Sequence, residues 1–375
     1  MKKIVELKKL LEVCAEDSSR KEWVRSRCIY ENRKFSEGES HWNEDLGNGS
    51  FVIQDGETEI EAFAFKDRTD LESITIPESV SKIGKGAFNG CIRLENIIIP
   101  DSVTEIGNLA FRGCSSLTNI TIPDSVTKIG IYAFASCTSL ESVVIPDSVN
   151  EIGKCAFYYC TSLKNIVIPD SVNEIGIYAF ASCLSLERIT LPDSISEIGD
   201  GAFEGCFSLK NIVIPDSVTW IGEYAFSGCK SLRSITIPDS VNEISTCAFA
   251  YCDNLENIVI PDGATKIGDY AFDRCKSLKN ITLPDGVNEI GEGAFKGCSS
   301  LRSINIPDGV TWIGDYAFNG CTGLESITIP DSVTEIVWGA FKGCTGLRRI
   351  SLPKNVKLDN NVFDGCSTDL HIEYR

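Results

Sequence analysis

The sequence predicts a solenoid of about fourteen stacked coils, each 23 residues long, on the evidence of three regular series. Proline recurs every 23 residues from Pro77 to Pro353, and this series holds every proline in the chain. Cysteine recurs at the same spacing from Cys91 to Cys344, and the apolar positions between them hardly vary. Such a period is typical of a solenoid, because one coil cannot bury its own apolar face and stacked coils share a core.

Both ends of the array are eroded. In the first coil Phe51-Val52-Ile53 keeps the strand pattern, but Gln54 replaces proline and Arg68 replaces cysteine. In the last coil Cys366 comes one residue early, and Asp359 falls on a normally apolar position. Atypical end repeats are expected, because an end coil faces water or a cap. The array therefore runs from about residue 51 to residue 375.

Residues 100–122 represent one coil. The segment 117–122 alternates apolar and polar residues and predicts a strand, which stacking turns into a parallel sheet. Residues 100–102 predict a turn, and 103–107 a second short extended segment. Residues 110–114 are too few for a full helix and favour a 3₁₀ turn. The expected inward positions are Val103, Ile106, Ala110, Phe111, Cys114, Leu117, Ile120 and Ile122.

The repeated pattern L-x-x-I-x-I-P-D-S-V-x-x-I-G-x-x-A-F-x-x-C resembles the BspA-like (Treponema-type) leucine-rich repeat over residues 51–375. Leu94, Ile97 and Ile99 match its strand, and Phe111 and Cys114 match its A-F-x-x-C segment. The resemblance implies a curved right-handed leucine-rich-repeat solenoid with its parallel sheet on the concave face. It also implies a binding role, often adhesion at microbial surfaces, without assigning that role to particular residues.

Residues 1–50 lie outside this pattern and form the other predicted unit. Ile4, Leu7, Leu11 and Cys14 share one helical face, and residues 20–30 suit a second helix. We expect either a small helical cap over the first coil or a separate docking segment.

Charge and composition exclude several kinds of partner. The net charge is −18, and the acidic excess belongs to the repeats because residues 1–50 are balanced. Such a surface repels nucleic acid and anionic lipid, and no apolar run is long enough to span a membrane. The N-terminus lacks the pattern of a signal peptide, which favours the cytoplasm, whereas the resemblance suggests the cell surface. The location stays open.

Most of the 17 cysteines belong to the 23-residue ladder. A buried thiol stack needs only a small apolar residue, and neighbouring coils place cysteines too far apart for a relaxed disulfide. Free thiols fit a reducing compartment. No C-x-x-C pair occurs, so we expect no zinc site and no cofactor.

No constellation for catalysis is present. The two histidines, His41 and His371, lie at opposite ends of the sequence, and no phosphate loop, G-x-S-x-G or H-E-x-x-H occurs. Aspartates recur in the turns from Asp101 to Asp331, where we expect them to cap backbone amides. A calcium ladder and an ice-binding polar array are the alternatives. We predict a protein that is not an enzyme.

The candidate binding residues lie where the strand sequence varies. The first position after the strand leucine mostly alternates in charge along the coils, which allows cross-strand ion pairs, and the second position adds Arg188 and Arg349. Early coils carry Glu72, Glu95 and Glu141 there, whereas later coils are mainly basic. We predict that an acidic partner contacts the concave-face strip Lys164, Arg188, Lys210 and Arg233.

Two aromatic patterns stand apart from the strands. Large apolar residues replace small or polar ones at five places and predict either an apolar contact patch or local packing: Tyr158, Tyr159, Leu184, Phe207 and Tyr251. Two residues before each A-F phenylalanine, tyrosine alternates with glycine or cysteine, so we expect each ring to lean over its smaller neighbour. Trp220 and Trp312 are 92 residues apart, as expected from duplication of a four-coil block.

These observations predict a non-catalytic protein-binding scaffold of the BspA-like adhesion or interaction type. We expect a monomer that binds a protein partner. The alternative is an intracellular structural adaptor in which residues 1–50 make the contact and the coils act as a spacer.

Overall fold

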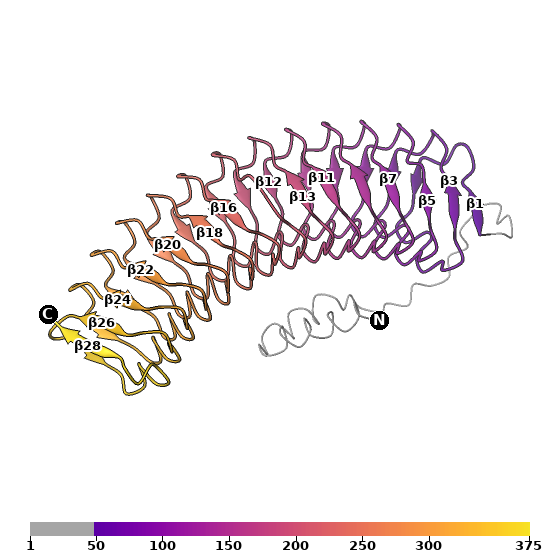
Figure 1. The fold of residues 1–375 in the computed structure, drawn as a ribbon. Coiled ribbons are helices and arrows are strands. Elements are labelled where there is room, and N and C mark those ends of the chain that lie inside the picture. Colours follow the sequence, from indigo (N-terminus) through magenta and orange to yellow (C-terminus); the bar gives the residue numbers. More distant parts are fainter. Residues whose placement is uncertain (1–48) are drawn as a thin grey trace. The chain divides into compact units, whose positions relative to one another are not determined.

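Two short extended segments recur along the coils, as the apolar spacing predicts. The protein is represented by a computed structural model that describes residues 49–375, which form a parallel β-solenoid following an arc (Figure 1). No residue in that range is helical. The predicted helical cap or docking segment lies outside the described residues, apart from residues 49–50.

The longer strands lie side by side along one side of the coils (Figure 1). They are β1 Ser50–Val52, β3 Ser73–Thr75, β5 Asn96–Ile97, β7 Asn119–Thr121, β9 Ser142–Val144, β11 Asn165–Val167, β13 Arg188–Thr190, β16 Ser234–Thr236, β18 Asn257–Val259, β20 Asn280–Thr282, β22 Ser303–Asn305, β24 Ser326–Thr328, β26 Arg349–Leu352 and β28 His371–Tyr374. Between β13 and β16, Asn211 forms only an isolated parallel bridge to Arg188.

The shorter strands form the second series, with two residues each. They are β2 Glu59–Ile60, β4 Lys82–Ile83, β6 Glu105–Ile106, β8 Lys128–Ile129, β10 Glu151–Ile152, β12 Glu174–Ile175, β14 Glu197–Ile198, β15 Trp220–Ile221, β17 Glu243–Ile244, β19 Lys266–Ile267, β21 Glu289–Ile290, β23 Trp312–Ile313, β25 Glu335–Ile336 and β27 Lys357–Leu358. The fourteen shorter strands, one in each coil, agree with the predicted number of coils.

Strand pairing follows the 23-residue period until the last coil. Phe51 pairs with Ile74 in register, which confirms the eroded first coil. At the other end Ile336 pairs with Leu358, one residue short of the 23-residue period. The last coil therefore lacks one residue, and the deletion lies before its shorter strand, β27. The placement of Asp359 on an apolar position was therefore wrong: Leu358 fills that position, and Asp359 is exposed.

A column of phenylalanine rings runs through the core. From Phe88 to Phe341, neighbouring rings stack with their centroids 5.2 to 5.8 Å apart. The rings are fully buried, and the expected inward positions around them are buried as well. Because each ring packs against the next coil, the coils stabilise one another.

The segment expected to form 3₁₀ turns alternates between two hydrogen-bond partners. Ala110 N–H donates to Gly107 in its own coil, whereas Phe111 N–H donates to Ala133 in the next coil, at 3.2 and 2.7 Å. The residues before Ala-Phe and before cysteine have positive φ, as at Leu109 (63°) and Gly113 (75°). Alternate amides can therefore cross to the next coil, which satisfies backbone groups that a short helix would leave unpaired.

Candidate binding surface

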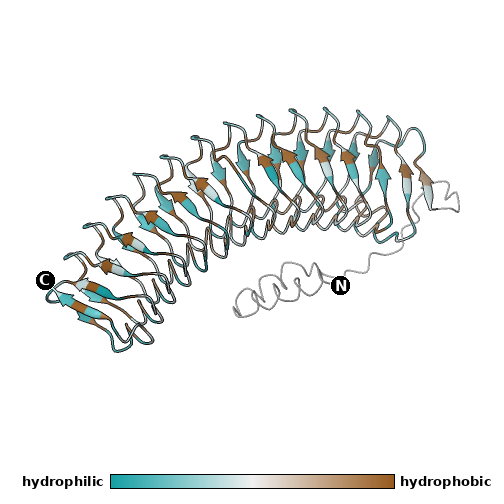
Figure 2. Ribbon diagram, in the orientation of Figure 1, coloured by the Kyte–Doolittle hydropathy of each residue, from teal (hydrophilic) through white to brown (hydrophobic). Residues whose placement is uncertain are grey.

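The exposed residues of the longer strands form one surface, which we call the strand face. Each coil contributes three: the two residues after the strand leucine, and the residue between the two inward isoleucines. In the coil of β11 these are Lys164, Asn165 and Val167. Exposed and buried positions alternate along the strands, which directs these side chains outward, and most of the exposed positions are hydrophilic (Figure 2).

The four predicted binding residues are all exposed on the strand face, but they differ in their partners. Lys164 Nζ lies 2.7 Å from Oε2 of Glu141, and Lys210 Nζ lies 2.8 Å from Oε2 of Glu187. Arg188 and Arg233 make no ion pair with any residue of 49–375. Both arginines therefore keep their full set of donors for a partner.

Cross-strand ion pairs account for much of the charge alternation. Lys279 Nζ lies 2.9 Å from Oε2 of Glu256, repeating the Lys210–Glu187 arrangement. The bonded lysines lower the pKa values of Glu187 and Glu256. These pairs are exposed, so each contributes little to stability.

The strand face also carries an apolar row that the sequence analysis missed. Its position, between the inward isoleucines, is β-branched in eleven successive coils, from Val52 to Thr282. Strand propensity explains threonine there, but not the exposed aliphatic side chains. These are Ile98 (83% exposed), Val144, Val167, Val213 (81%) and Val259 (57%). The I-x-I pattern could have predicted this row, because the residue between two inward-facing isoleucines of a strand must face outward.

The five large apolar residues predicted as a contact patch are all half-buried. Lys230 Nζ lies 4.4 Å from the ring centroid of Phe207, and the Arg274 guanidinium lies 5.3 Å from that of Tyr251. The rings of Tyr158 and Tyr159 have centroids 6.2 Å apart. Much of this aromatic surface thus has partners within the chain, and its role in binding stays a prediction.

The turn aspartates do not cap the turns as expected. Asp147 is exposed and makes no hydrogen bond or ion pair within residues 49–375. Instead Val149 N–H donates to Pro146 and closes the turn. The hydroxyl of Ser148 donates to the carbonyl of Val126 in the preceding coil, at 2.7 Å. Serine therefore links neighbouring coils, while aspartate leaves a row of charge in solvent.

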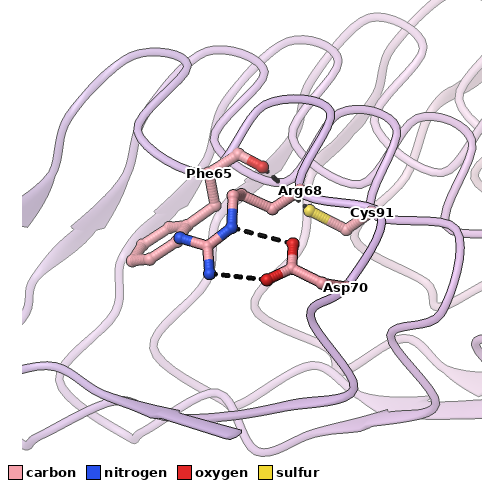
Figure 3. Close-up of polar contacts among 4 residues, drawn as sticks. All are labelled: Phe65, Arg68, Asp70 and Cys91. Atoms are coloured by element: carbon pink, nitrogen blue, oxygen red, sulfur yellow. Dashed lines mark hydrogen bonds and ion pairs between the residues drawn. The ribbon is translucent and has the colours of Figure 1, made fainter. Parts of the chain in front are cut away.

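The thiol ladder is buried and makes hydrogen bonds. Cys91 Sγ donates to the carbonyl oxygen of Phe65 across 3.0 Å (Figure 3), and equivalent bonds recur along the array. All fifteen cysteines within residues 49–375 are free thiols. Burial raises the pKa of Cys137 to about 12. Because the thiolate is the reactive form, the ladder is suited to packing rather than nucleophilic chemistry.

The first coil replaces the thiol with an ion pair. Arg68 stands at the cysteine position and binds Asp70 through two bonds, Nε to Oδ1 and Nη2 to Oδ2, both 2.9 Å (Figure 3). The Arg68 guanidinium also lowers the pKa of Asp70. A charged pair suits an end coil, because its outer side is not covered by another coil.

Tyrosine and glycine alternate for steric reasons, as the sequence predicted. A Cβ atom added to Gly339 would lie 2.7 Å from Cε1 of Tyr316, and the same clash recurs between Tyr270 and Gly293. The ring of each tyrosine therefore occupies the space that its smaller neighbour leaves.

One carboxyl group is buried in the turn segment that joins the shorter strand of a coil to the next longer strand. Asp273 is 6% exposed, and its Oδ1 atom has no hydrogen-bond partner among the described residues. Burial raises its pKa, while the charges of Lys296 and Arg274 partly oppose the shift. The preceding coil has Ala250 at the same position.

Residues 49–375 contain no group of three or more His, Cys, Asp or Glu side chains able to hold a metal ion. Within the same range, no helix is long and apolar enough to cross a membrane.

Comparison with known proteins identifies the repeat. The family model described as "BspA type Leucine rich repeat region (6 copies)" matches residues 45–164, 150–264 and 242–369. No curated protein matches the chain.

Three solved structures are similar to this chain. A leucine-rich repeat protein from Bacteroides ovatus is 31% identical, with 92% of this chain and 99% of that chain covered and a TM-score of 0.80. A leucine rich cell surface protein from Faecalibacterium prausnitzii is 34% identical, with coverages of 87% and 90% and a TM-score of 0.57. A leucine-rich repeat protein from Eubacterium ventriosum is 26% identical, with coverages of 72% and 82% and a TM-score of 0.54.

Proposed function

Because the chain belongs to the BspA-type leucine-rich repeat family, we propose that it is a non-catalytic scaffold that binds a protein partner through the strand face. The observation that carries the proposal is the apolar row lying beside arginines that have no ion pair. Val213 is largely exposed in the coil between those of Arg188 and Arg233.

The chemistry of this surface suits an acidic protein. Aliphatic side chains supply burial energy, and a guanidinium can bind a carboxylate through two hydrogen bonds. A surface of strands is already ordered, so little conformational entropy is lost when a partner binds. The similar cell surface protein of Faecalibacterium prausnitzii makes adhesion one form that this binding could take.

Capture of partners from extracts tests the proposal. The full chain is compared with a strand-face variant, K164E/R188E/K210E/R233E. The control variant, K82E/K128E/K266E/K357E, changes the net charge equally but on the shorter strands. We expect the strand-face variant to lose the partner and the control to retain it. Equal binding by all three proteins would refute a role for the strand face.

The adaptor alternative has its own variant. Deletion of residues 1–48 leaves every coil in place. If the partner is lost on deletion but survives the strand-face reversal, the contact lies in the N-terminal segment and the coils act as a spacer.

A further inference from the structure

The strand face is self-complementary over eight consecutive coils, from β3 to β16. An axis placed between β9 and β11 and parallel to the strands relates each coil on one side to a coil on the other. We propose that this face binds a second copy of the chain, forming a two-fold dimer about that axis. The inference rests on the proposed function, because it names a partner for the same surface.

The apolar row is symmetric about the axis. Val144 of β9 and Val167 of β11 flank it, and both are exposed. Ile98 and Val213 lie two coils further out on either side, and they are the most exposed members of the row. Threonine fills the remaining four positions, which also match in pairs: Thr121 with Thr190, and Thr75 with Thr236.

The charged column has the same symmetry with opposite signs. Across the axis, Glu141 corresponds to Lys164, Glu95 to Lys210 and Glu72 to Arg233. In the remaining pair of coils, Thr118 corresponds to Glu187 and Asn119 corresponds to Arg188. Every glutamate on the acidic side of the axis therefore has a base as its counterpart. The acidic partner of Lys164, Lys210 and Arg233 is thus the acidic half of another copy, whereas Arg188 faces Asn119.

Rotation about this axis produces the required contacts. It turns one strand face toward the other, reverses the order of the coils and keeps the direction of the strands. Each column then faces the same column of the second copy, so Ile98 meets Val213 and Glu95 meets Lys210. Such an interface is isologous, and it closes after two chains instead of growing into a filament.

The charges and the apolar row together favour this register. Moving the axis by one coil toward the C-terminus keeps Glu141 opposite Lys210 and Lys164 opposite Glu187, but it sets Glu95 opposite Glu256. Moving it by one coil toward the N-terminus sets Glu72 opposite Glu187. Both shifts also place valine against threonine across the axis. Like charges brought together at an interface disfavour the shifted pairings.

The area predicts a weak and salt-sensitive dimer. Eight coils spaced about 5 Å apart and three exposed columns about 13 Å wide cover roughly 500 Å² per copy. The total of roughly 1,000 Å² lies at the lower limit for a specific interface. We therefore expect reversible association that weakens as salt is added.

Sedimentation equilibrium of the purified full chain tests the dimer. E95K and K210E should each weaken association at least tenfold, and the double variant E95K/K210E should restore it. K279E is the matched control, because it also removes one cross-strand pair, Lys279–Glu256, but outside the eight coils. A monomeric wild-type chain, or single variants that associate like wild type, would overturn the dimer.

Two substitutions in the apolar row give a second test of the dimer. V213N should weaken association, whereas V259N, in the same row but outside the eight coils, should not. Equal effects of the two would also overturn the dimer. E95K leaves the basic strip intact, so a monomeric wild-type chain whose E95K variant still captures a different partner would refute only the dimer and would leave the proposed function standing.

Discussion

The Sγ atom of Cys206 donates a hydrogen bond to the carbonyl oxygen of Phe180 in the preceding coil, across 3.2 Å. The same relationship recurs along the array, and the ladder thiols from Cys91 to Cys344 are buried and bonded. Burial raises the pKa of these thiols, and the reactive thiolate is scarce at neutral pH.

We therefore expect the ladder to resist alkylation in the folded protein. At pH 8, iodoacetamide should leave the buried ladder cysteines unmodified and react with all of them after unfolding in guanidinium. Within residues 49–375, only Cys247 and Cys366 are partly exposed, so they serve as internal positive controls. Peptide mass mapping reads both sets, and rapid native labelling of Cys206 would contradict the account.

Serine and aspartate in one turn should differ in their importance for stability. S148A removes the hydrogen bond to Val126 and should lower the free energy of unfolding by about 0.5–1.5 kcal/mol. D147A removes an exposed side chain without partners and should change it by less than about 0.5 kcal/mol. Denaturant titration compares the two. A larger loss for D147A would restore the capping role first assigned to aspartate.

Two glycines with similar backbone conformations should tolerate alanine differently. Gly339 and Gly343 have φ of 61° and 73°, so alanine at either should cost about 1–2 kcal/mol. G339A should cost more than G343A, because its Cβ also meets the Tyr316 ring, whereas that of G343A has only ordinary contacts at 3.7 Å. Denaturation midpoints measure the difference, and the Y316G background should abolish it.

Replacement of the buried aspartate should stabilise the protein. D273A removes a buried carboxyl group whose Oδ1 atom has no hydrogen-bond partner, and it reproduces the alanine of the preceding coil, so we expect a gain of about 1–3 kcal/mol at pH 7. A loss of stability in urea titration would indicate that the charges of Arg274 and Lys296 outweigh burial.

The same group predicts a pH dependence. The pKa of Asp273 is raised in the folded state, so folding favours its protonated form. The contribution of Asp273 to the free energy of unfolding is therefore largest at a pH below its pKa in the unfolded chain. It is lost as the pH rises through its higher pKa in the folded protein. The advantage of D273N over wild type should therefore shrink between pH 7 and pH 4. A constant advantage would show that protonation of Asp273 is not involved.

Periodicity explains why so much of the fold was predictable. One period places Pro100, Phe111 and Cys114 at equivalent points of a coil, and neighbouring coils must then stack. The tyrosine–glycine complementarity was also readable, because Tyr316 and Gly339 occupy equivalent positions in adjacent coils. Residues that break the period, such as Asp359, were placed less well, because a deletion can be absorbed anywhere in a turn.

The atoms that a side chain contacts were not readable in the same way. Ser148 and Asp147 both suit a turn, and only the structure reveals that serine reaches the preceding coil. The thiols were expected to be small fillers, whereas their hydrogen bonds depend on where the carbonyl of Phe180 points. The row containing Val213 was overlooked because β-branched residues are ordinary in strands, and exposure distinguishes the aliphatic ones.

Photo-cross-linking tests most directly whether the strand face carries recognition. A benzophenone side chain is placed at Thr190, on the strand face, and in a second protein at Thr219, which precedes a shorter strand. In extracts, the account predicts cross-links to a bound protein from position 190 and none from position 219. Cross-links from position 219 alone would contradict it and would move the binding surface to the other side of the coils.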